Sequence, residues 1–483
     1  MSEPYRTEAD FLGEQPVLRD VLWGIHTARA TENFPLADRP VHPELVRAYG
    51  QVKLACARTN RALGVWVDDT VKAEAIERAC GEMAEGLLTE HVVVDRLQGG
   101  AGTSLNMNVN EVLANRALQL LGDQPGHYAR VSPTDDINRH QSTNDTFPTA
   151  LRLAAIALLR RLDDRLAGLE KSFLAAGKRF AHVVKIGRTE MQDAVLTTLG
   201  REMGAYAEAF HRDRRRIRRC EDRLRVVNLG GTAIGTGLAA PREYVLRATE
   251  ALREVTGLSL ARAEDLVDAT QNADGFVEAS GLIKACATSL LKVCGDLRFM
   301  SSGPQAGLGE IHLPQRQAGS SIMPGKVNPV IPEAVSQVAM LVMGYDATIT
   351  LACASGNLEL NPFLPLVANC LLDGIELLGR ACDILRRLCV DGLEADERQC
   401  RRHVDNSTAA ATALVPVLGY EAASHLAERA IRAGRTVREQ VAVEQVMTVE
   451  QFDALVRAEA TCGLGQPQGE APPADLTTSR DKS

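Results

Sequence analysis

Four short segments carry more small hydroxyl and amide side chains than their apolar surroundings require. Hydroxyl, amide and ammonium groups donate hydrogen bonds, so such segments could together bind a small anion and stabilise negative charge on oxygen. The segments are Gly102-Thr103-Ser104 with Asn106 and Asn108, Gln141-Ser142-Thr143-Asn144-Asp145, Gly187-Arg188-Thr189-Glu190, and the eleven residues GSSIMPGKVNP at 319–329.

The fourth segment is the most informative. Its two glycines and two prolines exclude a regular helix. Ser320, Ser321, Lys326 and Asn328 supply hydroxyl, ammonium and amide donors, which could surround an anionic oxygen together with backbone N–H groups. A plain surface turn that leads into the helix after Pro329 is the other interpretation, and composition alone leaves both open.

The other three segments are weaker evidence when each is taken alone. A hydroxyl or amide side chain before a helical pattern is also typical of an N-cap, a role that Asn144 or Thr146 could fill. The glycine-rich run at 228–237 has the spacing of neither a P-loop nor a dinucleotide fingerprint, and we expect no strand before it. The 10 histidines contain no H-x-H or H-x-x-x-H pair, so we expect no metal centre.

The elements that must position these segments are mainly long helices. Hydrophobic spacing predicts helices over 46–63, 149–181, 197–227, 274–300, 329–353 and 362–390. Along the third of these, apolar residues step by alternating threes and fours, which is typical of a heptad seam buried against another helix. They are Met203, Tyr206, Phe210, Ile217, Cys220, Leu224 and Val227, interrupted only by Asp213. The predicted fold is therefore mainly α, with a central bundle of long helices.

The 483 residues divide by pattern into three domains and a tail. Residues 1–145 are mixed, 146–397 form the long-helix domain with the fourth segment, and 398–462 form a small helical domain. The tail at 463–483 is rich in Pro and Gly, so we expect it to be disordered. Long Ala-rich helices expose apolar stripes that a bundle shared between chains would bury, which predicts a homo-oligomer.

Composition limits the partners and the compartment. With 54 basic and 62 acidic side chains the net charge is −8, which gives no reason to expect nucleic acid or a membrane surface. The basic run at 211–225 contains interleaved acids, which favours a solvated or subunit-facing ion-paired surface over a polyanion site. Eleven cysteines without a C-x-x-C pair favour reduced thiols. The N-terminus MSEPYRTEAD is polar and acidic, so we expect no secretory signal. No stretch approaches the ~20 uncharged apolar residues of a membrane span, so we expect a soluble, cytoplasmic protein.

The segment GSSIMPGKVNP resembles the signature loop of the aspartase/fumarase superfamily almost letter for letter. Over about residues 10–455 the other segments are also similar to the family, in its order, and are most like its aspartases. They are WGIHTARATENF (23–34), GGAGTSLNMNVNEVLANRAL (99–118), QSTND (141–145), NLGGTAIGTGL (228–238) and SSGPQAGLGEI (301–311). The resemblance implies a three-part subunit whose long helices form a twenty-helix core in a homotetramer, with each active site built by three subunits.

The resemblance also implies an activity and a role for each matching residue. The enzyme would remove the C3 proton of a C2-substituted succinate through an aci-carboxylate intermediate, with Ser320 as the base, and expel the substituent. No organic cofactor is required, and activation by a divalent cation stays open. Asn144 would lie near the leaving group. Two sets would hold the substrate carboxylates: Lys326, Asn328 and Thr189 for one, and Thr103, Ser142, Thr143 and Ser321 for the other.

Two positions depart from the family pattern near the leaving group. Glu190 stands where fumarases and some aspartases carry His, and Ser132 stands where fumarases carry the histidine of a second anion site. Both departures count against a fumarase. An ionised Glu190 would attract an ammonium group, whereas a neutral one, if Glu333 raised its pKa, could donate a hydrogen bond to a nitro or hydroxyl group. A tolerated variation in a working aspartase is the third interpretation.

The resemblance therefore implies conversion of L-aspartate to fumarate and ammonia. The alternatives are a nitrosuccinate lyase that releases nitrite and fumarate, and a fumarate hydratase that acts on malate. A non-catalytic oligomeric scaffold of the same fold belongs to a different class of function. Because a retired enzyme need not keep Ser320, Lys326 and Asn328 together, the retained donor set argues against the scaffold.

Overall fold

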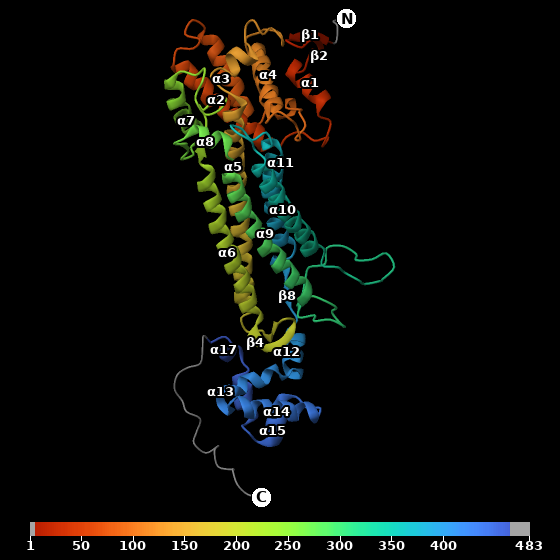
Figure 1. Ribbon diagram of the computed structural model, residues 1–483. Helices are drawn as coiled ribbons and strands as arrows, with labels where there is room; N and C mark the ends of the chain where they lie inside the picture. The colour runs from red at the N-terminus through yellow and green to blue at the C-terminus, as the bar shows by residue number, and fades with distance from the viewer. Residues whose placement is uncertain (1–4, 464–483) are drawn as a thin grey trace. The chain divides into compact units, whose positions relative to one another are not determined.

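The computed structural model describes residues 5–463 and is mainly helical (Figure 1). The long helices are α2 (Pro43–Ala62), α5 (Thr143–Arg179), α6 (Leu199–Leu224), α9 (Asp274–Met300), α10 (Val330–Ala354) and α11 (Leu364–Leu388). They confirm the six helices that hydrophobic spacing predicts, with the largest difference at the start of α5. The predicted tail at 463–483 lies, apart from Gly463, outside the described residues.

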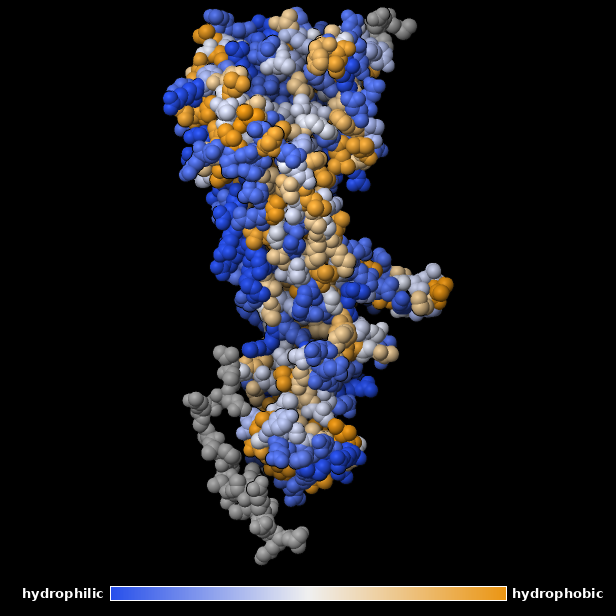
Figure 2. Space-filling view, in the orientation of Figure 1, coloured by the Kyte–Doolittle hydropathy of each residue, from blue (hydrophilic) through white to orange (hydrophobic). Residues whose placement is uncertain are grey.

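The predicted seam of α6 is buried. Met203, Phe210 and Ile217 are at most 1% exposed, and Asp213, which interrupts the seam, is also buried. The other face of this helix is hydrophilic (Figure 2). Several of its basic side chains form ion pairs, which agrees with an ion-paired helix surface. The pairs include Arg214 and Arg218 with Asp163, Arg223 with Glu278, and Arg225 with Glu221.

The chain divides into two compact units. The first comprises residues 1–165, 213–288 and 337–380, and the second comprises 166–212, 289–336 and 381–483. In the first unit α2 packs against α3 (Thr70–Ala84) and α7 (Arg242–Thr256), and α3 packs against α4 (Thr103–Leu120). These four helices lie together near the N-terminus in Figure 1. The boundaries of the three domains stay a prediction.

A two-stranded hairpin and several short helices share a core in the second unit. Strand β3 (Val184–Thr189) pairs antiparallel with β4 (Gln192–Thr198). Ile186 and Leu196 of this hairpin pack in one apolar cluster with Val404 and Leu414. The sequence patterns do not predict this hairpin, whose first strand contains residues 187–189. The two strands are too short, and their alternation too weak, for a pattern of period two to be evident.

The remaining elements are short. They are β1 (Tyr5–Asp10), β2 (Gly13–Leu18), α1 (Ile25–Asn33), β5 (Val226–Val227), β6 (Ala261–Arg262), α8 (Leu266–Gln271), β7 (Ile311–His312), β8 (Glu394–Ala395), α12 (Glu397–Asn406), α13 (Val415–Leu418), α14 (Tyr420–Arg432), α15 (Val437–Glu444), α16 (Val449–Leu455) and α17 (Ala458–Thr461). Strands β1 and β2, and β7 and β8, pair antiparallel, whereas β5 and β6 pair parallel. Segment 226–227 is thus a strand directly before the glycine-rich run, contrary to the sequence expectation.

Helix α10 has an exposed apolar face. It is the one described helix that is long and apolar enough to cross a membrane by length and composition, and only 28% of its most apolar window is buried. Glu333 and Asp346 interrupt this helix, so it contains no uncharged apolar stretch of ~20 residues, in line with the sequence expectation. Met340 and Leu351 are 57% and 70% exposed. Asp346 is buried, however, and accepts hydrogen bonds from Lys284 Nζ (2.5 Å) and Ser280 Oγ (2.8 Å), an ion pair that favours a core helix over a membrane span.

Candidate functional site

The segment that contains Thr103 is fixed at the start of α4. Gly102 precedes the helix with a φ of +94°, and a Cβ atom there would lie 2.1 Å from the Phe147 ring. Only glycine therefore lets the loop approach α5 so closely. Gln98 Oε1 accepts a hydrogen bond of 2.8 Å from Leu105 N, which ties the loop to the first turn of α4. Thr103 itself is exposed and directed to no partner among the described residues.

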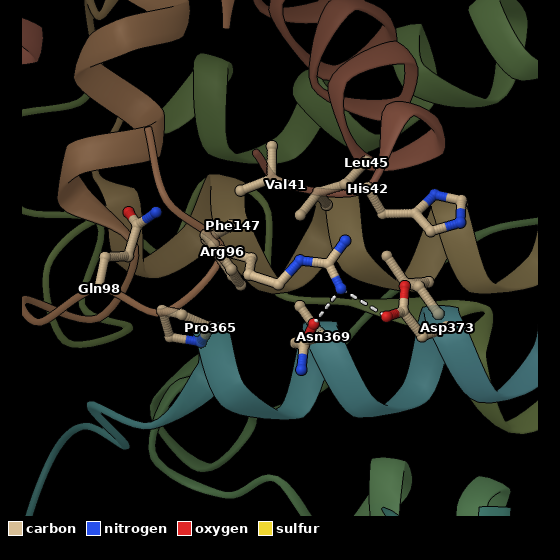
Figure 3. A pocket seen from close by; sticks show the side chains of 11 residues that line it. Val41, His42, Leu45, Arg96, Gln98, Phe147, Pro365, Asn369 and Asp373 are labelled. Carbon is tan, nitrogen blue, oxygen red and sulfur yellow. Dashed lines mark hydrogen bonds and ion pairs between the residues drawn. The ribbon is translucent and has the colours of Figure 1, made fainter. Parts of the chain in front are cut away.

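A small pocket of the first unit shows how this loop is held to α11 (Figure 3). Arg96 extends across the pocket, and its Nη1 donates to Asn369 Oδ1 (2.8 Å) and Asp373 Oδ2 (2.5 Å). Gln98 lines the same pocket from the segment that leads to Thr103. The cavity of about 10 Å³ has room for little more than one water molecule, and a bonded arginine crosses it, so it offers no substrate site. Its polar side chains hold the loop to α11.

The predicted anion-binding residues at 142–144 lie where α5 begins. The helix starts at Thr143, and Ser142 Oγ accepts the Asn144 N–H at 3.2 Å, so Ser142 takes the N-cap role that we expected of Asn144 or Thr146. Asn144 Nδ2 donates to Ala233 O at 2.7 Å, and Asn228 Nδ2 donates to Asn144 O at 3.0 Å. The glycine-rich run at 228–237 therefore supports this loop.

Asp145 connects the loop at 142–144 to the glycine-rich run at 228–237. Its buried carboxylate accepts backbone N–H groups of Ser142 (3.0 Å), Gly230 (3.1 Å) and Thr232 (3.0 Å). Burial raises the pKa of Asp145 to about 6, although these hydrogen bonds oppose the shift. Asp145 belongs to one of the four polar segments, but no sequence pattern assigns it a role. Its partner Gly230 lies 85 residues away in the chain, and nothing in the local pattern indicates that contact.

Lys53 is a second supporting residue that sequence analysis missed. It is 1% exposed, and its Nζ donates to Gln141 Oε1 (2.8 Å) and Asn138 Oδ1 (3.2 Å). Burial lowers the pKa of Lys53 to about 8. Asn106, one turn after Thr103, donates to Thr143 Oγ1 at 3.0 Å. The available signal was a lysine on the apolar face of the helix predicted at 46–63, where a charge requires polar partners.

The second unit carries Thr189 and Glu190 at the tip of the β3–β4 hairpin. Glu190 and Met191 form a two-residue turn with φ values of +53° and +64°. Two positive φ values are typical of a type I′ turn, which usually carries Asn or Gly, so these larger residues hold a strained backbone. Thr189, Glu190 and Met191 are exposed, and within residues 5–463 the Glu190 carboxylate has no ion pair.

The predicted signature loop lies in the long, exposed segment between β7 and α10 (Figure 1). Gly319 N donates to Lys326 O at 2.8 Å, and Asn328 Nδ2 donates to Gly319 O at 3.0 Å, so the two ends of the loop meet. Ser320 Oγ accepts the N–H groups of Ile322 and Met323, both at 3.2 Å. The structure thus brings Ser320, Lys326 and Asn328 into one loop. Ser321 and Lys326 are exposed.

Glu333 and Ser132, the two positions compared with the fumarase pattern besides Glu190, each have a partner nearby. Glu333, in the first turn of α10, lies 4.0 Å from Arg298, and no contact to Glu190 is present among the described residues. Ser132 Oγ accepts the Asp135 N–H at 3.0 Å and begins a five-residue turn that carries Asp135 and Asp136. Two carboxylates make this turn unsuited to bind an anion.

The predicted site residues fall into two groups. Thr103, Ser142, Thr143 and Asn144 belong to the first unit, and Thr189, Glu190, Ser320, Ser321, Lys326, Asn328 and Glu333 belong to the second. Hydroxyl and amide donors dominate the first group, whereas the second adds the candidate base, an ammonium and a carboxylate. Neither unit by itself contains every donor that the chemistry requires. Within the described residues no cluster of three or more potential metal ligands is present.

Comparison with known proteins places the chain in a family. A lyase family model matches residues 13–344, and a model for the fumarase C C-terminus matches 411–462. The chain is 43% identical to an aspartate ammonia-lyase of Bacillus subtilis over 452 residues, covering 94% of this chain and 95% of the other. It is 47% identical to an aspartate ammonia-lyase of Pseudomonas aeruginosa over 448 residues, covering 92% and 94%.

Solved structures agree with this similarity. A fumarate lyase:delta crystallin from Brucella melitensis, bound to cobalt, superposes with a TM-score of 0.90 at 46% identity and covers 94% of this chain and 98% of its own. A class II fumarase from Schistosoma mansoni superposes with a TM-score of 0.89 at 32% identity and covers 95% and 99%. The mainly helical fold predicted from the sequence is thereby confirmed.

Proposed function

The chain belongs to the aspartase/fumarase superfamily as a carbon–nitrogen lyase, and from that membership we propose that it converts L-aspartate to fumarate and ammonia. The observation that carries the proposal is the joint presence of aspartate ammonia-lyase relatives at 43–47% identity and the signature loop with its serine, lysine and asparagine. The substrate class, a small dicarboxylate, follows from the family. That the leaving group is ammonia is the more specific part of the proposal.

Ser320 is the proposed base. A serine hydroxyl removes a weakly acidic proton only when its alkoxide is stabilised. The Ile322 and Met323 N–H groups already donate hydrogen bonds to Ser320 Oγ, and these bonds would become stronger as negative charge develops on that oxygen. Lys326, whose carbonyl accepts the Gly319 N–H across the closed loop, would add a positive charge near the same region.

The proposed reaction proceeds in two steps. Ser320, as the alkoxide, takes the proton from C3 and becomes a hydroxyl, and the electron pair of that C–H bond moves into the neighbouring carboxylate to give a dianionic aci-carboxylate. The pair then returns to form the C2–C3 double bond while the C2–N bond breaks, and ammonia leaves with the electrons of that bond. Lys326, Asn328 and Thr189 would hold one carboxylate, and the hydroxyl-rich group of the first unit would hold the other.

The remaining site residues fit the leaving of ammonia. Glu190 carries a carboxylate at the hairpin tip, which would attract the ammonium of aspartate. Asn144 is proposed to lie near the same group, and Glu333, paired with Arg298, supports the start of α10. Neither an organic cofactor nor a metal takes part in the proposed steps.

We further propose a homotetramer in which three subunits build each site. Two observations support this assembly. The required donors are divided between two units, and α10 leaves Met340, Leu341 and Leu351 exposed, 45–70% each. A helix bundle between copies would cover these side chains, as expected for a soluble, cytoplasmic protein. Figure 2 shows apolar surface over the middle of this helix.

Turnover of three substrates tests the proposal directly. Fumarate formation is followed by ultraviolet absorbance with L-aspartate, L-malate and nitrosuccinate side by side. We expect turnover of L-aspartate. Silence on L-aspartate with turnover of nitrosuccinate would keep the fold and the base but assign Glu190 to a different leaving group. Silence on all three would favour the non-catalytic scaffold.

The base is tested by Ser320→Ala. Removing a general base costs about 100-fold or more in rate, so we expect kcat on the active substrate to fall by at least that factor. Ser259→Ala is the matched control, because Ser259 is exposed in the segment between α7 and β6 and belongs to neither predicted group. Full activity of Ser320→Ala would sink the proposed mechanism.

A further inference from the structure

The end of α12 reaches both strands of the hairpin that carries Thr189 and Glu190. On β3, Arg188 Nη1 donates to Glu310 Oε1 at 2.8 Å. On β4, Asp193 Oδ2 accepts the Ser407 hydroxyl at 2.8 Å. Arg188 Nε lies 3.4 Å from Asp193 Oδ1, so an ion pair closes the hairpin just before its strained tip.

His403 completes the connection to β3. Its Nδ1 lies 3.0 Å from the same Glu310 oxygen that Arg188 contacts. A carboxylate only accepts hydrogen bonds, so Nδ1 carries the proton. The other ring nitrogen, Nε2, lies 3.0 Å from Gln399 Nε2, one helical turn earlier, so both ring nitrogens have a polar partner.

His403 and Ser407 are four residues apart, so they lie on one side of α12 at its C-terminal end. Helix α12 packs against β3, and the 3₁₀ segment Thr408–Leu414 packs against β4. In Figure 1 the labels β4 and α12 mark neighbouring elements. One end of a single helix therefore holds both strands of the hairpin, one through Glu310 and one directly.

Glu310 makes this connection stiff. Its side chain is fully buried, and Lys185, 2% exposed, lies 3.1 Å from its second oxygen. Lys185 and Arg188 keep the pKa of Glu310 below its ordinary value despite burial, so the carboxylate is ionised. A buried ion that loses a partner is strongly disfavoured, which restricts Arg188 and His403 to their observed positions.

The tip needs such bracing. Glu190 and Met191 occupy positive φ values that cost free energy in non-glycine residues, and these conformations persist only where the surroundings hold them. The apolar side of the hairpin is fixed by Ile186 and Leu196 in the cluster with Val404. On the polar side, the contacts of Arg188 and Asp193 are the nearest ones to the tip.

We propose that His403 and Ser407 are positioning residues, through which the C-terminal helix α12 sets the geometry of the Thr189–Glu190 tip for substrate binding. Neither residue lies in a segment with a predicted site role. The inference rests on the proposed function only for its kinetic consequence. The physical connection can be measured without any substrate.

The experiment combines hydrogen exchange with kinetics on the full-length protein. His403→Leu and Ser407→Ala remove one hydrogen bond each to a charged partner. We expect amides at residues 188–193 to exchange about tenfold faster, and KM for L-aspartate to rise about tenfold while kcat changes less than about threefold. His403→Asn and Ser407→Thr retain the donor and should restore both values.

The control and the opposing outcomes are specific. Arg402→Gln, on the exposed side of the same helix, should leave exchange and KM unchanged. Unchanged exchange at 188–193 in both disruptive variants would overturn the inference. Faster exchange without a change in KM would also overturn it, since the contacts of His403 and Ser407 would then stabilise the hairpin without affecting substrate binding. A wild-type protein that does not turn over L-aspartate contradicts the proposed function instead. The exchange result then still shows whether His403 and Ser407 hold the hairpin tip. If His403→Leu does not fold, Ser407→Ala decides alone.

Discussion

Glu190 is the side chain on which the identity of the leaving group depends. It lies at an exposed, strained hairpin tip, and no cation pairs with it within the described residues. A carboxylate in that position is available to an incoming ammonium group. Its backbone strain also indicates a position that is held for a purpose other than stability.

Glu190→Gln separates the ammonium contact from a tolerated variation. Glutamine keeps the size and a carbonyl acceptor but loses the charge, and a hydrogen bond to a charged group is worth about 1.5–3 kcal/mol. We therefore expect kcat/KM for L-aspartate to fall about 10- to 100-fold in steady-state assays. Glu208→Gln, an exposed acid on α6, is the control. An unchanged kcat/KM would mean that Glu190 does not contact the ammonium.

Asp145 gives stability a pH dependence of its own. Its folded pKa of about 6 lies above the ordinary 3.8, so the folded state holds this proton more tightly than the unfolded state. The contribution of Asp145 to stability is therefore fully present below the unfolded pKa of 3.8 and is lost as pH rises through about 6, a total change of about 3 kcal/mol. We expect wild type to lose stability relative to Asp145→Asn across this range. Denaturant unfolding at several pH values measures the difference, and a constant difference would contradict it.

At the scale of elements, the long helices could be predicted because their apolar spacing repeats over many turns. α9 begins and ends at the predicted residues, and the seam of α6 is buried as expected. The β3–β4 hairpin could not, because six- and seven-residue strands leave too few alternations to count. Its core partners, such as Val404 and Leu414, lie about 200 residues away in the chain.

The residues of the candidate site could likewise be predicted where they share one motif, but not where they act through distant partners. Residues within one motif, such as Ser320, Lys326 and Asn328, could be recognised together, and the structure places them in one closed loop. Lys53 and Glu310 could not be recognised, because each acts through partners that are distant in sequence. Long-range hydrogen bonds leave no periodic signal, whereas a buried charge on an apolar face does leave a weak one.

The close contact of the 99–103 loop with α5 predicts that Gly102 cannot be replaced by a larger residue without loss of stability. Alanine at Gly102 would place its Cβ 2.1 Å from the Phe147 ring on a backbone with positive φ. Overpacking and strain each cost about 1–3 kcal/mol, so we expect Gly102→Ala to lower the free energy of unfolding by at least that amount and to raise KM. Gly81→Ala, inside α3 with nothing within 4 Å, should instead stabilise by about 0.5–1 kcal/mol. Equal effects of the two variants in denaturant unfolding would contradict this account.

At the scale of the whole molecule, the division of the donors decides how active sites can form. Thr103 lies in the first unit and Ser320 in the second, and α10 has an exposed apolar face. If three subunits build each site, Thr103 and Ser320 of one site come from different chains. Two inactive variants could then restore each other, which is impossible if each chain builds its own site.

Mixed tetramers of Thr103→Ala and Ser320→Ala test this arrangement. Each variant alone should be nearly inactive, because every site lacks one required group. After the two are unfolded together and refolded in equal amounts, roughly a quarter of the sites should receive an intact Thr103 from one chain and an intact Ser320 from another. The regained rate of fumarate formation measures that fraction, with light scattering to show that tetramers have re-formed. Mixing without unfolding is the control, since subunits that do not exchange should regain nothing. Tetramers that re-form without any gain in rate would show that the two groups act within one chain.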